Sequence, residues 1–274
     1  MAYSEGKLAV ITGAGSGIGR ALALHLNREG CALCLSDINS TTLEATLGML
    51  PRTEVPASGE VLDVADRAAV HGWAQELGTR HGHVDIVVNN AGVALVATVE
   101  ESDYADLDWL MGINFWGVVH GTRAFLPFLR RAEQGHLVNI SSVFGLIGVP
   151  TQSAYNAAKF AVRGYTEALR QEMAGSNVHV CCVHPGGIRT AIARNARGSS
   201  PGLTAEERGS EFERLARTTP ESAAAQIVKA IERRRKRLLI GGDARYISLI
   251  SRLFPASYPR LLPGLGRPAH SLSR

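Results

Sequence analysis

Seven short apolar runs, separated by helical patterns, constrain the fold of this chain more than any other feature of its sequence. They are Leu8–Thr12, Ala32–Ser36, Glu60–Asp63, Ile86–Asn89, Leu137–Ser141, Val178–Val183 and Leu238–Ile240. Because the runs are continuously apolar instead of alternating, they predict strands buried on both faces, as in a parallel sheet covered by helices. Right-handed crossovers between such strands produce a doubly wound α/β fold. We therefore expect a seven-stranded parallel sheet with helices on both faces.

The helical patterns between these runs have readable limits, and no linker or internal repeat interrupts them. The expected helices include Gly17–Glu29, Asp66–Arg80, Glu101–Leu129 and Gln152–Ala174. We expect one Rossmann-type catalytic domain over residues 1–243, with a segment at about 188–217 inserted within it, and a basic amphipathic tail over residues 244–274. Within the inserted segment, the Gly/Ser/Pro cluster Arg197–Pro201 predicts a mobile loop.

Composition and charge argue against several other classes of protein. Nowhere do about 18 apolar residues follow one another, and Met1–Lys7 lacks the apolar core of a signal peptide, so we expect a cytoplasmic protein. The four cysteines lie in or beside apolar runs, which predicts core packing, and no metal-ligand spacing is present. The net charge of +4 is concentrated in residues 231–274, which carry +8, and aromatic residues make up only 6% of the chain. A nucleic-acid-binding face would interleave basic and aromatic residues, so we expect no nucleic-acid partner.

A glycine-rich turn directly follows the first predicted strand and leads into a helix. It reads Thr12-Gly13-Ala14-Gly15-Ser16-Gly17-Ile18-Gly19. Glycines allow a tight turn and a close approach of the backbone to a pyrophosphate, while the helix N-terminus offers unpaired N–H groups and a partial positive charge. A glycine-rich stretch alone also marks ordinary turns. Because the strand, the turn, the helix and a second strand follow in order, we expect a dinucleotide to bind at Gly13, Gly15, Ser16, Gly17, Ile18 and Gly19.

Asp37 ends the second predicted strand, 18 residues after Gly19. A carboxylate at this place accepts hydrogen bonds from the adenosine ribose hydroxyls and repels a 2′-phosphate, so it favours NAD over NADP. Neither Ser16 in the glycine turn nor Ile38 after the acid offers a basic group for that phosphate. The alternative is that Asp37 only caps the following helix.

Three further motifs complete a pattern that one known family shares. They are Asn89-Asn90-Ala91-Gly92, the pair Tyr155 and Lys159 spaced as Y-x-x-x-K, and Pro185-Gly186. Together with the T-G-x-x-x-G-x-G turn, they make residues 6 to 240 resemble the short-chain dehydrogenase/reductase family. The resemblance implies a Rossmann-like fold and an NAD-dependent oxidoreductase that interconverts an alcohol and its ketone or aldehyde by hydride transfer. The alternative is a non-catalytic dinucleotide-sensing or scaffold protein of the same fold, which would be expected to have lost a catalytic residue.

Tyr155 and Lys159 are four residues apart on a predicted helix, so their side chains project from one face. A phenol titrates at about 10, too high for a base at neutral pH, and we expect the nearby ammonium to lower the pKa of Tyr155. The resemblance implies that Ser142 binds the substrate oxygen and that Asn114 orders a water against Lys159. Ser141 is the alternative to Ser142, because alternate residues of a strand face opposite ways. For Asn114 the alternative is a buried polar residue satisfied within its own helix.

The resemblance also assigns the rest of the dinucleotide site and an assembly. The assigned residues are Asp63 and Val64 for the adenine, Asn89, Ala91 and Gly92 for the wall beside the adenosine, and Pro185, Gly186, Ile188 and Thr190 for the nicotinamide. The helices Glu101–Leu129 and Gln152–Ala174 would pack against their copies in a homodimer or homotetramer, since closed two-fold contacts are the commonest kind.

The substrate pocket is expected to be lined by segments that follow the motifs. These are Val93–Leu95, Val143–Ile147 and Ala191–Arg217, of which the first two are apolar. They favour a hydrophobic small-molecule substrate, such as a medium or long alcohol, an isoprenoid or a steroid-like ketone. The alternative is that these apolar residues serve only to pack the core.

The tail carries an apolar stripe of its own. Tyr246, Leu249, Ile250 and Leu253 recur at helical spacing and the pattern ends at Pro255, with Arg245 and Arg252 outside the stripe. A basic run, Arg233–Arg237, precedes it. One interpretation docks the stripe over the body or a neighbouring subunit near the substrate entrance. The other places the stripe and the basic residues against an anionic membrane surface, as a peripheral contact.

Overall fold

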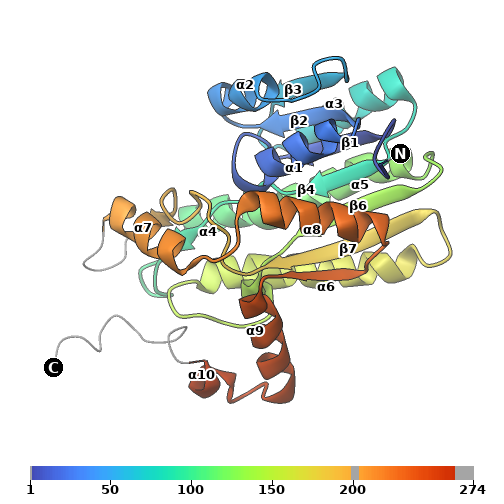
Figure 1. Cartoon of the computed structure of the whole chain (residues 1–274). Coiled ribbons are helices and arrows are strands. Elements are labelled where there is room, and N and C mark those ends of the chain that lie inside the picture. Colours follow the sequence, from blue (N-terminus) through green and yellow to red (C-terminus); the bar gives the residue numbers. More distant parts are fainter. Residues whose placement is uncertain (1, 199–203, 263–274) are drawn as a thin grey trace.

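Seven parallel strands form the sheet around which the protein is built (Figure 1), and the computed structural model describes residues 2–198 and 204–262. The strands are β1 (Leu8–Thr12), β2 (Ala32–Asp37), β3 (Ala57–Val61), β4 (Ile86–Asn89), β6 (Gly135–Ile140), β7 (Val178–Pro185) and β9 (Arg237–Ile240), in the order β3-β2-β1-β4-β6-β7-β9. The predicted seven-stranded, Rossmann-like sheet is confirmed. The third strand was predicted at Glu60–Asp63, which begins three residues and ends two residues too late. It lies at the edge of the sheet with most of its residues exposed, so it has no continuous apolar run to mark it.

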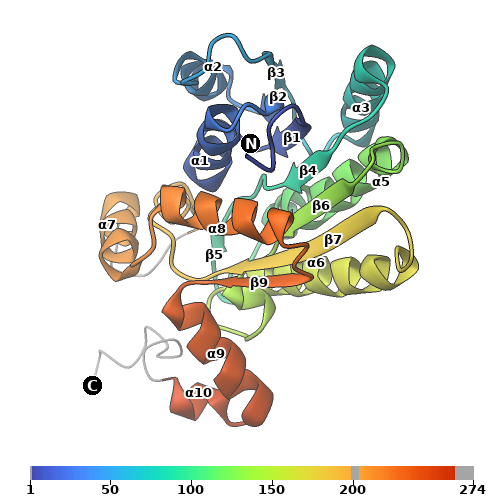
Figure 2. The ribbon, with the colours of Figure 1, turned by 45° about the vertical axis from the view of Figure 1, so that its right-hand side comes forward.

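Helices cover both faces of the sheet (Figure 2). One face carries α1 (Gly17–Arg28), α2 (Ser40–Gly48) and α8 (Pro220–Glu232), and the other carries α3 (Arg67–His81), α5 (Gly117–Leu129) and α6 (Ser153–Glu172). Neighbouring residues of β1 show why the strand must be apolar throughout. Ile11 belongs to the core cluster with Leu22 of α1, and Val10 belongs to the opposite cluster with Phe125 of α5.

The predicted helix Glu101–Leu129 is divided into three pieces. It begins at α4 (Tyr104–Met111), where the carboxylate of Asp103 accepts a hydrogen bond from the Ala105 N–H at 2.9 Å and caps the first turn. A π-helical turn, η1 (Gly112–Trp116), follows, and α5 completes the segment. Such π-turns interrupt the regular backbone hydrogen bonding and are frequent at functional sites. This one contains Asn114.

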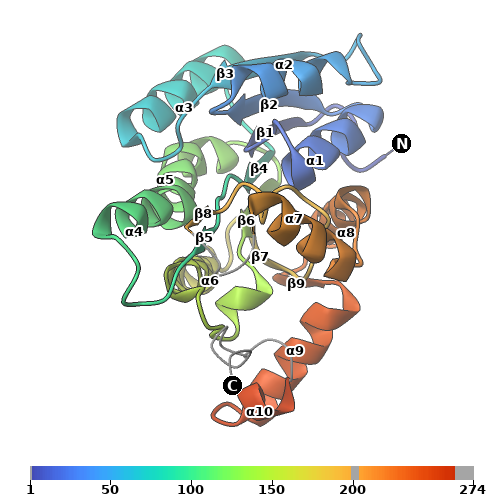
Figure 3. The same ribbon diagram turned by 90° about the vertical axis from the view of Figure 1, so that its left-hand side faces the viewer.

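Shorter elements lie at the carboxyl edge of the sheet. A two-stranded parallel pair joins β5 (Leu95–Val96) to β8 (Arg197–Gly198), and α7 (Ala205–Leu215) follows (Figure 3). The first two residues of the predicted loop Arg197–Pro201 pair with β5, and residues 199–201 lie outside the described part.

The C-terminal segment forms two helices beyond the last strand. They are α9 (Gly242–Leu253) and α10 (Tyr258–Leu261), and both lie at the periphery of the molecule, away from the sheet (Figure 1). Within residues 2–198 and 204–262, no helix is long and apolar enough to cross a membrane.

Candidate active site

The predicted site residues meet at the carboxyl ends of β1 and β4, where the strand order changes direction. This switch point is the place where open α/β sheets bind ligands. Two turns are joined there. The hydroxyl of Thr12 accepts hydrogen bonds from the N–H groups of Asn90 (3.0 Å) and Ala91 (3.1 Å), and the Asn90 amide donates to the Thr12 carbonyl at 2.9 Å. Sequence reasoning missed this positioning role of Asn90, although the residue lies within the Asn-Asn-Ala-Gly motif.

The glycine turn leaves space that side chains would fill. Gly13 has φ of 65°, and a Cβ there would lie 2.7 Å from the Ala91 Cα. A Cβ on Gly17 would lie 3.1 Å from Thr190 Cγ2. Ser16 precedes α1 without forming a side-chain cap, and the first turn of α1 contains no acid. A cavity of about 260 Å³, which Glu221 also lines, lies between Ser16 and Thr190. A positive helix end beside open space fits a phosphate group.

Asp37 lies beside the glycine turn and does not cap α2. One carboxylate oxygen accepts a hydrogen bond from the Gly15 N–H at 2.8 Å, and the other accepts from the Asn39 N–H at 3.0 Å. The cap of α2 is Asn39 itself, so the alternative interpretation of Asp37 is wrong.

A basic residue that sequence reasoning missed, Arg20, lies near the same turn. Its guanidinium donates to the Gly15 carbonyl and, at 3.0 Å, to the Thr46 hydroxyl. The guanidinium of Arg20 is therefore hydrogen-bonded to oxygens of the protein. Ile38 is 66% exposed at the rim of this region.

The residues assigned to the adenosine differ in what they present to the site. Asp63 is exposed and caps the next turn, accepting from the Ala65 N–H at 2.9 Å, while Val64 is buried. The side chain of Asn89 is 2% exposed and donates to the Asn139 amide oxygen at 2.8 Å. It therefore points into the interior, so only the main chain of Asn89 can face a ligand.

Tyr155 and Lys159 lie on α6, facing the end of β6. The Lys159 ammonium donates to the Ile140 carbonyl at 3.1 Å and lies 5.6 Å from the centre of the Tyr155 ring. Ser142 is hydrogen-bonded to the Tyr155 phenol. The Ser141 hydroxyl instead donates to the Lys159 carbonyl at 2.8 Å, in the interior. Of the two serines, the structure therefore brings Ser142 to the tyrosine.

The pKa of Tyr155 differs from the lowered value that the Tyr155–Lys159 spacing led us to expect. Burial raises the pKa of Tyr155 to about 12, and the hydrogen bond with Ser142 opposes that rise. Burial also lowers the pKa of Lys159 to about 8. The expected net lowering of the phenol pKa is thus wrong for the protein chain by itself. Burial, which the sequence does not show, penalises the charged forms of both groups.

Asn114 lies close to the lysine but uses its side chain elsewhere. Its amide oxygen accepts from the Val93 N–H at 2.8 Å, and its amide nitrogen donates to the Val93 carbonyl at 2.9 Å. A Cβ on Gly92 would lie 3.3 Å from the Asn114 oxygen and 3.4 Å from the Lys159 nitrogen. The amide is therefore satisfied by the segment after β4 and not within its own helix, and Gly92 keeps the space between Asn114 and Lys159 open.

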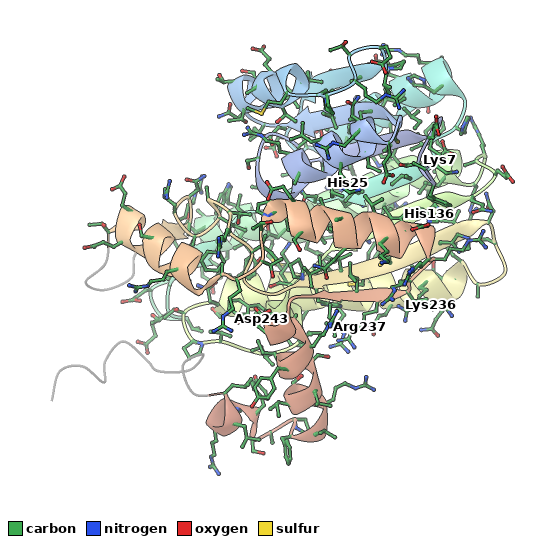
Figure 4. All side chains as sticks on the ribbon, viewed as in Figure 1. Lys7, His25, His136, Lys236, Arg237 and Asp243 are labelled. Carbon is green, nitrogen blue, oxygen red and sulfur yellow. The ribbon has the colours of Figure 1, made fainter. Side chains whose placement is uncertain are left out.

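The turn after β7 is held from the C-terminal end of the chain. The Gly187 N–H donates to a carboxylate oxygen of Asp243 at 2.7 Å, and Figure 4 shows Asp243 just beyond the carboxyl end of β9. Ile188 is buried, and Thr190 follows with its methyl group near Gly17. Sequence reasoning missed Asp243, because 56 residues separate it from Gly187 and no motif links them.

The apolar segments near Tyr155 serve both packing and the pocket. Leu95, Val143 and Ile147 are at most 5% exposed and belong to core clusters. Phe144 is only half-buried, and its ring meets the Tyr155 ring edge-on with centroids 6.1 Å apart. Core packing therefore accounts for part of the predicted wall, and Phe144 keeps surface next to the phenol.

Comparisons with known proteins agree on one family. The short chain dehydrogenase family model matches residues 7–200. "Putative oxidoreductase SadH" of Mycobacterium tuberculosis is 47% identical over 266 residues, which are 96% of each chain. "Dehydrogenase/reductase SDR family member 7B" of Xenopus tropicalis is 34% identical over 88% of this chain and 79% of its own. The crystal structure of a short chain dehydrogenase/reductase from Burkholderia phymatum in complex with NAD superimposes with a TM-score of 0.84, at 30% identity over 98% of this chain and 99% of that one.

Proposed function

Because this chain belongs to the short-chain dehydrogenase/reductase family of NAD(P)-binding oxidoreductases, we propose that it interconverts an apolar alcohol and its ketone or aldehyde, with NAD(H) as cofactor. The observation that supports this most is the grouping of Ser142, Tyr155 and Lys159 at the carboxyl end of β6, the strand next to β4. A protein that only sensed the dinucleotide would not need a phenol hydrogen-bonded to a hydroxyl beside a buried ammonium. The grouping therefore favours catalysis over the sensing alternative.

In the proposed mechanism Tyr155 exchanges a proton with the substrate oxygen, and Ser142 holds that oxygen by a hydrogen bond. With its pKa raised to about 12 by burial, the phenol is protonated at neutral pH and is ready to act as the acid in reduction. Oxidation requires phenolate, which nearby positive charge stabilises. Lys159 supplies such a charge below its own pKa of about 8. A bound NAD⁺ would supply the hydride acceptor.

We assign Asn114 a positioning role in the same site. Its two hydrogen bonds fix the backbone of Val93, which follows Gly92 beside Lys159. Because both polar atoms of the Asn114 side chain are bonded to Val93, we propose that a water relaying protons to Lys159 is held by the main chain of the π-helical turn. The π-helical turn supports this proposal, since it frees carbonyl groups from the regular helical pattern.

The preference for NAD rests on the surroundings of Asp37. The carboxylate lies against the glycine turn, Ile38 is apolar, and the guanidinium of Arg20 is used by Gly15 and Thr46. A 2′-phosphate would therefore meet the negative charge of Asp37 at the glycine turn, whereas the guanidinium of Arg20 is directed at neutral oxygens of the protein. Side-by-side titrations with NADH and NADPH test this, and tighter binding of NADPH would contradict it.

We further propose that residues 1–243 act as one catalytic unit, with the segment at about 188–217 inserted within it, and that the unit assembles as a homodimer or homotetramer. Three aromatic side chains on the helices expected at the interface support the assembly. Tyr104, Trp116 and Phe160 are 83%, 50% and 41% exposed in the single chain. Such side chains are enriched at interfaces. Light scattering should give a mass above the 29.3 kDa of one chain, and a monomer at working concentrations would contradict the assembly.

The proposed substrate class follows from the apolar surface beside the phenol. Phe144 is half-buried against Tyr155, and Val93 is half-buried after Gly92. Purified protein incubated with NAD⁺ and a panel of alcohols of increasing chain length should form NADH, with kcat/KM rising with apolar surface. A preference for short, polar alcohols would contradict the substrate class, and no NADH from any alcohol, nor NADH consumption with the matching ketones, would contradict the function.

A further inference from the structure

The C-terminal helix α9 docks on the body through a face other than the predicted stripe. Ala244 and Ile247 are buried in a cluster with Val143 and Ile147, next to the active site. In the stripe, only Ile250 is partly buried. Tyr246, Leu249 and Leu253 are 54%, 55% and 62% exposed. The sequence did not distinguish the two faces, because Ala244 and Ile247 begin an apolar pattern on the opposite side of the same helix.

The exposed side of the two C-terminal helices combines apolar and basic side chains. We call it the arm surface, and on α9 it comprises Tyr246, Leu249, Leu253 and the following Phe254, flanked by the exposed Arg245 and Arg252. On α10 it continues with Leu261, 41% exposed, and Arg260. No acidic residue occurs from 244 to 262. The arm surface therefore carries three positive charges and no acid.

The positive charge of the arm surface distinguishes between two possible partners, which are a second copy of this chain and a lipid bilayer. A second copy bound symmetrically through the arm surface would bring arginines of like charge together, which costs free energy. A bilayer containing acidic lipids would accept the apolar side chains at the boundary of headgroups and acyl chains, and would place phosphates against the arginines. We propose that the arm surface binds an anionic lipid bilayer.

Helices α9 and α10, which carry the arm surface, are hydrogen-bonded to the loops that border the active site. The Tyr258 hydroxyl accepts from the Gly148 N–H at 2.8 Å, and Asp243 holds the Gly187 N–H. A bilayer on the arm surface would therefore be separated by the width of α9 from the segment Val143–Val149, on which the opposite face of the helix packs. We propose that this placement brings apolar alcohols dissolved in the bilayer close to the pocket. This second step rests on the proposed function, whereas lipid binding itself does not.

Co-sedimentation of the full chain with vesicles tests the proposal. We expect the protein to pellet with vesicles of phosphatidylcholine and phosphatidylglycerol, and not with phosphatidylcholine alone. Substituting Arg245→Gln or Arg252→Gln should weaken binding about fivefold each at low salt. The double variant Leu249→Ser with Leu253→Ser, which keeps the charge, should abolish pelleting. The control Val99→Ser removes an apolar side chain that is 77% exposed elsewhere and should leave pelleting unchanged.

Equal pelleting with neutral and anionic vesicles, or none with either, would overturn the proposal. Normal pelleting of the Leu249→Ser and Leu253→Ser variant would also overturn the proposal. The same holds if the only change in this variant is a smaller mass in light scattering, because the arm surface would then bind a second copy of the chain. Oxidation of a water-soluble alcohol, measured without vesicles, reports separately on the proposed function. The leucine variants should retain that activity, because neither leucine is part of the active site.

Discussion

Replacing Lys159 with methionine should stabilise the fold while it removes activity. Lys159 is 3% exposed, and burial lowers its pKa to about 8 from the ordinary value of 10.5. That difference corresponds to a charge-burial cost of about 3 kcal/mol at neutral pH. Loss of the hydrogen bond to the Ile140 carbonyl offsets about 1 kcal/mol of it. We therefore expect Lys159→Met to raise the free energy of unfolding by about 2 kcal/mol at pH 7.

The sign of this effect makes it dependent on pH. Because the pKa of Lys159 is lower in the folded state than in the unfolded state, its charge-burial cost is fully present below pH 8. The cost falls as the pH rises from about 8 and disappears above about 10.5, where the lysine is neutral in both states. Urea unfolding of both proteins at pH 7 and pH 10 should therefore show the advantage of the variant shrinking by about 2 kcal/mol.

A matched control separates this effect from a general gain of apolar surface. Lys229 on α8 is exposed, so Lys229→Met should change stability little and equally at both pH values. The reasoning would be refuted if Lys159→Met were less stable than the parent at pH 7, or if its stability difference from the parent were the same at pH 10.

Two further substitutions test the site. Asp37→Ala combined with Ile38→Arg should shift the preference toward NADP(H) by at least about tenfold in kcat/KM, because it removes a repulsive charge and adds a phosphate partner. An unchanged ratio of NAD to NADP activity would argue against the role of Asp37. Asn156→Ala should lower the free energy of unfolding by about 3 kcal/mol in urea titrations. The reason is that the buried amide of Asn156 accepts from the Val149 N–H and donates to the Ile147 carbonyl, in the segment that follows Ser142. A loss below about 1 kcal/mol would show that water replaces these hydrogen bonds.

The parts of the fold that the sequence predicts are those where burial forces a local pattern. The central strands are buried on both faces, so their apolar runs are continuous and their places were predicted closely. The edge strand β3 has no such pattern and was misplaced. The π-turn at Gly112–Trp116 was missed because a single i+5 turn shifts the helical register by only one residue, which is too small a change to stand out in the apolar pattern.

Features of the site that depend on distant segments could not be predicted. Asp243 meets Gly187 only because β9 lies beside β7 in the sheet. The side chain of Asn89 turns inward because Asn139 on the neighbouring strand receives it. The pKa of Tyr155 depends on how deeply the phenol is buried, which motif spacing does not report. By contrast, helical spacing predicted that Tyr155 and Lys159 share one face of a helix, and the family resemblance added Ser142 at the end of a strand.

The central claim is that Tyr155 is the acid/base of an oxidoreductase, and one variant tests it most directly. Tyr155→Phe keeps the ring that packs against Phe144 and removes only the hydroxyl that Ser142 bonds. Turnover of the best alcohol from the panel should fall by about a hundredfold or more, while the Kd for NADH, measured by fluorescence titration, should stay within about threefold. Turnover within about tenfold of the parent, with NADH binding intact, would remove Tyr155 from the mechanism.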